Sequence, residues 1–186
     1  MTMPRPACFT QKGMKEVFEQ AVKGRAFEYA VVPVAAIDFS AEVFRACETN
    51  MCGKYNKCWT CPPAAGSPES QKEKILAFSS AFVFTTRHEL EDSFDYGGMA
   101  NARDRHNSLV AEMHARFGKT NPVYGAGGCV LCETCTWPQP CRFPEKIFPP
   151  IEAAGIDVIG LSRAANLRYN NGKNTVTYFS MILFNE

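Results

Sequence analysis

Eight of the nine cysteines lie in two short stretches, and these residues are the part of the sequence best suited to chemistry. The first stretch spans residues 47–61 and the second spans residues 129–141. Disulfides in a secreted protein usually join distant loops, which would spread the cysteines along the chain. Tight groups of cysteine in a reducing compartment instead favour thiolate ligands for a metal. The candidate ligands are Cys47, Cys52, Cys58, Cys61, Cys129, Cys132, Cys135 and Cys141.

The second stretch has a spacing that favours an iron–sulfur cluster over a single metal ion. Its cysteines follow the pattern C-x2-C-x2-C-x5-C. Zinc sites normally take cysteines as C-x2-C pairs, and one ion cannot easily accept three thiolates from one tight loop. A cuboidal cluster can accept them, because each thiolate binds a separate iron. Bacterial ferredoxins use C-x2-C-x2-C-x3-C-P, so the first three positions match and the last gap is two residues longer.

The first stretch has the pattern C-x4-C-x5-C-x2-C and ends in Pro62-Pro63. The Cys-Pro ending is similar to a ferredoxin loop, although the spacing matches no standard signature. Because four cysteines suffice for one cluster, we expect two 4Fe-4S clusters, one in each of the loops 47–63 and 125–144. In two-cluster ferredoxins the fourth cysteine serves the other cluster, so Cys61 or Cys141 could be exchanged in that way. Zinc is the alternative cofactor, since four thiolates also suit it.

The residues around the cysteines allow two interpretations each. The run Gly125-Ala126-Gly127-Gly128 before Cys129 could bring backbone amides close to sulfur, or it could only make a turn after a helix. Aromatic side chains inside or beside the loops could shield the clusters from water, or they could belong to the core. These aromatic residues are Tyr55, Trp59, Trp137 and Phe143.

The cysteine motifs resemble those of the family of predicted metal-binding proteins grouped as DUF2284. The resemblance covers roughly residues 28–184 and implies metal binding, with iron–sulfur clusters as the expected group. Cys58 falls where the family commonly has another residue. The resemblance therefore leaves open whether the first cluster has a fourth thiolate or an open iron. The matching parts are Cys47, Cys52, Tyr55-Asn56-Lys57, Cys61-Pro62-Pro63, the run from Cys129 to Pro144, and Ile151 to Val158.

The composition restricts the class of protein. Of the 186 residues, 46% are hydrophobic and 21% are charged, which is an ordinary globular balance. The formal net charge of +1 argues against a nucleic-acid partner, which would favour a strongly basic chain. The longest apolar run is residues 29–37, interrupted by Pro33, which is too short to span a membrane. No apolar stretch follows the N-terminus, so we expect a cytoplasmic protein.

The hydrophobic pattern predicts an α/β fold with a single domain over residues 1–186, in which a mixed sheet is packed by helices. The strongest helix signal covers residues 100–117, with an apolar stripe that includes His106, Leu109 and Met113. Further helical segments are expected at 13–23, 40–46, from Ser67 or Ser70 to Phe78, and at 149–154, while residues 89–98 should form a loop. Strands are expected at 28–39, 80–86, 156–161 and 175–184.

Three functions are compatible with these features. The first is an electron carrier with two 4Fe-4S clusters and a redox partner protein, the second is an enzyme with an open iron that binds substrate, and the third is a structural zinc protein. No catalytic residue is predicted, His106 and His114 are expected to pack rather than bind metal, and Cys8 is expected to be a free thiol. Charged patches could contact a redox partner. They comprise the acidic Glu89, Glu91, Asp92 and Asp95 and the basic Arg163, Arg168 and Lys173.

Overall fold

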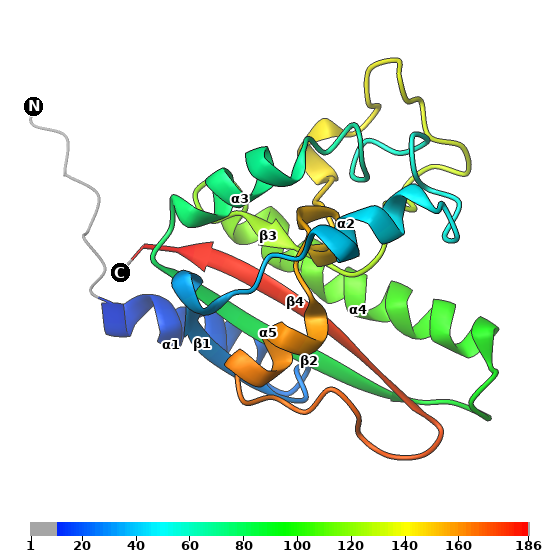
Figure 1. The fold of residues 1–186 in the computed structure, drawn as a ribbon. Coiled ribbons are helices and arrows are strands. Elements are labelled where there is room, and N and C mark those ends of the chain that lie inside the picture. Colours follow the sequence, from blue (N-terminus) through cyan, green and yellow to red (C-terminus); the bar gives the residue numbers. More distant parts are fainter. Residues whose placement is uncertain (1–10, 186) are drawn as a thin grey trace, which may run out of the picture.

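A computed structural model describes residues 11–185, and a four-stranded sheet forms its centre (Figure 1). The strands are β1 (Tyr29–Pro33), β2 (Ser80–Glu89), β3 (Val123–Tyr124) and β4 (Thr175–Phe184). The α-helices are α1 (Gln11–Val22), α2 (Ala41–Glu48), α3 (Pro68–Leu76), α4 (Tyr96–Phe117) and α5 (Val158–Ala164). Short 3-10 helices are η1 (Val34–Ala36), η2 (Pro144–Lys146) and η3 (Ile151–Ala154).

The strands lie in the order β1-β2-β4-β3. The long central pair β2 and β4 runs from Ser80 opposite Phe184 to Glu89 opposite Thr175. The predicted α/β class and the packing of helices against a sheet are confirmed. All three strand pairings are antiparallel, however, where a mixed sheet was expected. The strands are joined by long connections in place of tight turns, and the connections from β1 to β2 and from β3 to β4 carry the first and the second cysteine loop.

Helices cover both faces of the sheet, because side chains on successive strand residues point to opposite sides. On β2, Val83 contributes to a core with residues of η3 and α5, whereas Phe82 and Phe84 pack toward α1 and α4. Figure 1 shows these elements on the two sides of the sheet. Among residues 11–185, none of the helices combines the length and apolar character that crossing a membrane requires.

The long helix α4 is anchored to the sheet by a buried histidine. The predicted apolar stripe is confirmed, since His106, Leu109 and Met113 are buried. The ring of His106 is inaccessible to solvent, and its Nδ1 and Nε2 atoms lie 2.8 Å from Thr86 Oγ1 and 2.7 Å from Ser180 Oγ. Burial lowers the pKa of His106 to about 3, so the ring is neutral and satisfied by hydroxyls from β2 and β4.

The capping residues explain why several helices begin where the sequence predicts. Ser40 accepts hydrogen bonds from the first turn of α2, and Ser67 accepts one from Ser70 N at the start of α3. Gly155 closes η3 with a φ of 72°, a left-handed conformation that favours glycine. The segments expected at 40–46, 67–78 and 149–154 are thereby confirmed as helical, with small shifts of their ends.

Two strand predictions differ from the structure, one completely and one over part of its length. Residues 156–161 were expected to form a strand, but Val158 begins α5, because the Asp157 side chain accepts hydrogen bonds from Ile159 N and Gly160 N. A short apolar run fits either element, and the capping aspartate decides between them. The strand expected at 28–39 ends at Pro33, since proline has no N–H to continue the ladder and η1 follows. The loop expected at 89–98 is shorter, because Asp95 caps α4.

We predict that His106 makes stability depend on pH. Its folded pKa of about 3 lies below the unfolded value of about 6.5, so the unfolded chain binds one more proton between these values. This stabilisation is complete above pH 6.5 and is lost as the pH falls toward 3. We compare the wild type with His106→Gln by denaturant titration as the pH is lowered from 7 to 5. Over this range the free energy of unfolding of the wild type should fall by up to about 1.4 kcal/mol per pH unit more than that of His106→Gln.

The matched control is Thr86→Val, which removes a hydrogen bond to the ring but keeps the histidine. It should lower stability at every pH and retain the wild-type dependence on pH. Equal pH dependence in the wild type and His106→Gln would show that His106 does not titrate in this way.

Candidate metal centre

The two cysteine loops lie side by side at one end of the molecule (Figure 1). Cys47 lies in the last turn of α2, and the rest of the first loop leads from α2 to α3. The second loop leads from β3 to η2. Antiparallel pairing of β2, β3 and β4 fixes the starting points of these excursions, and the loops then contact each other directly.

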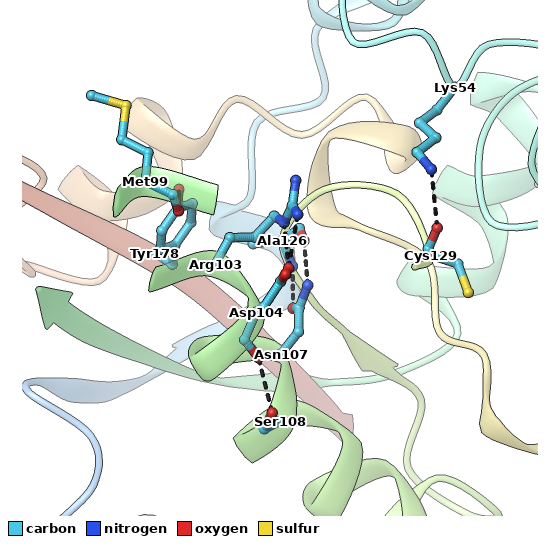
Figure 2. A network of polar contacts seen from close by, with 9 residues as sticks. All are labelled: Lys54, Met99, Arg103, Asp104, Asn107, Ser108, Ala126, Cys129 and Tyr178. Atoms are coloured by element: carbon cyan, nitrogen blue, oxygen red, sulfur yellow. Dashed lines mark hydrogen bonds and ion pairs between the residues drawn. The ribbon is translucent and has the colours of Figure 1, made fainter. Parts of the chain in front are cut away.

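The glycine run before Cys129 is fastened to α4. Asn107 on α4 donates from Nδ2 to Ala126 O at 2.7 Å and accepts from Ala126 N at 3.2 Å (Figure 2). Gly125 N donates to Pro149 O at 2.9 Å, and Ile151 N donates to Gly125 O at 3.0 Å. The start of the second loop is therefore fixed between the long helix and η3.

The backbones of the two loops meet at Cys129 and Gly128. Cys129 N donates to Thr60 Oγ1 at 3.0 Å. Lys54 Nζ donates to Cys129 O at 3.4 Å, a contact that Figure 2 shows. A Cβ atom placed on Gly128 would lie 3.0 Å from Cys61 Sγ and from Lys54 Cγ. The glycine therefore lets the second loop approach a sulfur of the first, which favours the first of the two interpretations of the glycine run.

Two tryptophans join the loops farther along. Trp59 Nε1 donates to Gln139 O at 2.9 Å, and Trp137 Nε1 donates to Asn56 Oδ1 at 3.0 Å. The two indole rings meet edge to face, with centroids 4.6 Å apart and planes at 89°. Such aromatic pairs contribute about 0.5–1.5 kcal/mol beyond the area they bury. These aromatic residues hold one cysteine loop against the other and do not belong to the core of the sheet.

Cys58 and Cys61 form a buried pair at the centre of the contact between the loops. Thr60 Oγ1 lies 3.3 Å from Cys58 Sγ and 4.0 Å from Cys61 Sγ. Hydrogen bonds from the Cys61 thiol and from Thr60 lower the pKa of Cys58 to about 5. The pKa of Cys61 is raised, because its thiol holds the proton shared with Cys58 and because it is buried. One thiolate is therefore stabilised here, and a thiolate is the form that binds metal.

Thiols of both loops lie near this pair. Burial and the charge of Cys52 raise the pKa of Cys47, and the charge of Cys52 also raises that of Cys61. In the second loop, burial and the charge of Cys58 raise the pKa of Cys129, with smaller effects of two nearby thiols. The second-loop cysteines line one small cavity, namely Cys129, Cys132, Cys135 and Cys141.

The eight thiols are free and close together, but they are not arranged as a finished site. Among residues 11–185, no three histidine, cysteine, aspartate or glutamate side chains converge as metal ligands. Metal binding commonly completes the geometry of cysteine loops, because the bound group brings together thiolates that otherwise repel each other. The soft thiol donors, four of which line one cavity, have the chemistry that an iron–sulfur or zinc group requires. Cys8 lies outside the described residues.

Glu152 is a polar group of this region to which the sequence-based analysis assigned no role. It lies on η3, and burial raises the pKa of its carboxyl, although its own amide and that of Gly127 donate hydrogen bonds to it. Its Oε2 atom is buried and has no hydrogen-bond partner. The charge of Glu152 also raises the pKa of Cys47, after the larger effects of burial and Cys52. A buried acid on a helical turn was the available sequence signal, and only the fold places it beside the first loop.

The three histidines contact residues other than the cysteines. His106 is held in the core, His88 is hydrogen-bonded to Thr86, and His114 Nε2 lies 3.2 Å from Glu145 O. A cavity of about 440 Å³ lies between α4 and the second loop, and its walls are mainly apolar. Its lining includes Ala111, Cys129, Val130, Leu131, Ile147 and Phe148.

One family model matches residues 30–184, and its description is "Predicted metal-binding protein (DUF2284)". The match covers both cysteine loops and all the strands except the first residue of β1. It confirms the resemblance that the cysteine motifs suggested. None of the curated proteins and none of the solved structures matches the chain.

We predict that Gly128→Ala pushes the two loops apart, because the new methyl group would contact Cys61 Sγ and Lys54 Cγ at 3.0 Å. Overpacking of this kind typically costs about 1–3 kcal/mol, so the free energy of unfolding in denaturant should fall by about that amount. The amount of bound metal per chain should fall as well. Gly97→Ala is the matched control, since its new Cβ meets only Asp95 Oδ1 at 3.8 Å. Wild-type stability and metal content in Gly128→Ala would contradict the close contact.

Proposed function

Because the chain belongs to the DUF2284 family of predicted metal-binding proteins, we propose that it binds two 4Fe-4S clusters and exchanges electrons with a redox partner protein. The observation that carries this proposal is the second loop. Its C-x2-C-x2-C-x5-C pattern suits an iron–sulfur cluster, and its four thiols line a single cavity. The first cluster takes its thiolates from the loop of Cys47 to Cys61.

The residues of this chain have three roles around such clusters. The thiolates bind iron, and when bound the clusters supply sites that accept and release single electrons. The Thr60 hydroxyl and the Cys129 backbone lie next to the Cys58 and Cys61 sulfurs, where hydrogen bonds stabilise thiolates. Trp59 and Phe143 line the second-loop cavity and keep water away from the sulfurs. Polarity, hydrogen bonds to sulfur and exposure are the properties through which a protein sets a cluster potential.

Electron transfer between the two clusters and with a partner is supported by the way the loops meet. The loops contact each other through Thr60 and Cys129, so clusters held in the two loops would lie on either side of this contact. Exposed apolar side chains at Met51, Val130 and Leu131 stand next to candidate ligands and offer a docking surface over the clusters. The charged patches are less suitable, since Glu89 pairs with Arg87 at 2.7 Å and Arg168 pairs with Glu28 at 2.8 Å. Eight free thiols are consistent with the reducing cytoplasm, and we propose a cytoplasmic location.

An enzyme with an open iron is the second candidate, and one observation favours it. The apolar cavity of about 440 Å³ borders Cys129, and its size suits a small organic substrate. A bound substrate would then lie beside a ligand of the second cluster. Full protein ligation of both clusters would favour the carrier, whereas one unligated iron would favour the enzyme. A structural zinc protein is the third candidate, and metal analysis separates it from the other two.

We predict about eight irons and eight sulfides per chain in protein purified without oxygen, because two 4Fe-4S clusters contain these numbers. Elemental and sulfide analysis measures both. The matched control replaces the four second-loop cysteines with alanine and should halve both values while it leaves the first cluster. Two zinc ions and no sulfide per wild-type chain would overturn the iron–sulfur proposal.

We also predict that the bound metal stabilises the fold. Both loops contain many proline and glycine residues and little apolar surface, so metal binding should supply part of the folding free energy. Chelation or oxidation of the clusters should lower the melting temperature measured by circular dichroism. If the apo and holo forms melt at the same temperature, the loops fold without metal and the prediction fails.

A further inference from the structure

The carboxylate of Glu152 has one oxygen whose partner the fold does not supply. The Oε2 atom is buried without a hydrogen bond, whereas the carboxylate accepts hydrogen bonds from the Gly127 amide and from its own. An unsatisfied buried polar atom costs about 1–3 kcal/mol, and more when it is charged. Among the 11–185 side chains, the other two such atoms are His114 Nδ1 and Asn171 Oδ1, and neither belongs to a side chain that influences a thiol.

The position of Glu152 connects it to the first cysteine loop. It lies on η3, which packs against α2, the helix that carries Cys47. Its charge acts on the Cys47 thiol, and the charge of Cys52 acts on both Cys47 and Cys61. Glu152 and Cys52 therefore both lie close enough to act on Cys47, and Cys52 also acts on Cys61, from η3, α2 and the first loop. Carboxylate oxygen is an accepted ligand of both iron and zinc.

Cys58 lies beside Cys61 and has several hydrogen-bond partners of its own. Its sulfur is buried within 3.3 Å of Thr60 Oγ1, and the amides of Thr60 and Cys129 stabilise its thiolate. Its charge acts on Cys61 and on Cys129 of the second loop. Cys58 thus already has partners from both loops, whereas Glu152 Oε2 has none.

We propose that Glu152 is the fourth protein ligand of the metal group in the first loop, binding through Oε2 beside Cys47, Cys52 and Cys61. This inference rests on the proposed function and specifies its first site. The Gly127 amide orients the carboxylate, so the glycine run of the second loop also positions a ligand of the first. The fourth corner of the first cluster is then closed by an oxygen ligand, and Cys58 is a hydrogen-bonded thiolate between the two clusters.

The test compares Glu152→Gln, Cys58→Ala and Glu48→Gln in protein purified without oxygen. Glutamine keeps the size and the acceptor for Gly127 but is a much weaker ligand, so the first cluster should lose about one iron per chain. Its electron paramagnetic resonance spectrum should change to that of a three-iron cluster. Glu48→Gln is the matched control, since Glu48 follows Cys47 directly but is exposed. It should keep the wild-type iron content and spectrum, and so should Cys58→Ala.

The outcomes separate the inference from the proposed function. Wild-type iron content and spectrum in Glu152→Gln would overturn the inference, and loss of iron in Cys58→Ala alone would assign the fourth position to Cys58. If Glu152→Gln loses both clusters through misfolding, Glu152→Cys decides, because a thiolate ligand there should restore eight irons with an altered spectrum. Failure of Glu152→Cys to restore iron would also overturn the inference. Absence of iron and sulfide in the wild type would refute the proposed function itself.

Discussion

The contact between the two cysteine loops is the interaction on which the rest of the site depends. The loops are separated by 67 residues between Cys61 and Cys129, yet Thr60 Oγ1 accepts a hydrogen bond from Cys129 N at 3.0 Å. Gly128 allows this approach, because a Cβ atom there would lie only 3.0 Å from Cys61 Sγ. The buried Cys58 and Cys61 are thereby brought next to Cys129. Thiolates repel each other, so such an arrangement calls for a cationic metal group to offset their charge.

The sheet and α4 hold the second loop in position for this contact. The sheet holds α4 through the buried His106, and Asn107, the next residue of that helix, holds Ala126 at the start of the second loop. One helix therefore connects the core to the metal region through two consecutive residues. Farther from the core, the Trp59 and Trp137 pair holds the two loops together. Backbone and side-chain hydrogen bonds thus fix the course of the loops, whereas the sulfurs do not converge as a finished ligand set.

Much of this arrangement was predictable from the sequence, and the exceptions have physical reasons. The cysteine patterns identified both loops, and Ser67 was one of two candidate caps for α3, because these signals are local. The helix at Val158 was missed, since an apolar run of this length suits a strand equally well. Glu152 was missed because its significance depends on Cys47 and Gly127, which are distant in the sequence. Nor could the pattern reveal that Trp59 and Trp137 bind opposite loops, since that contact exists only after the chain has folded.

The most direct test of the account is anomalous X-ray diffraction at the iron absorption edge from crystals grown without oxygen. The account predicts two separate iron sites, one beside Cys47, Cys52 and Cys61 and the other among the second-loop thiols. The two sites should adjoin each other across the contact between Thr60 and Cys129. No anomalous signal for iron in either loop, with zinc signal in its place, would contradict the account.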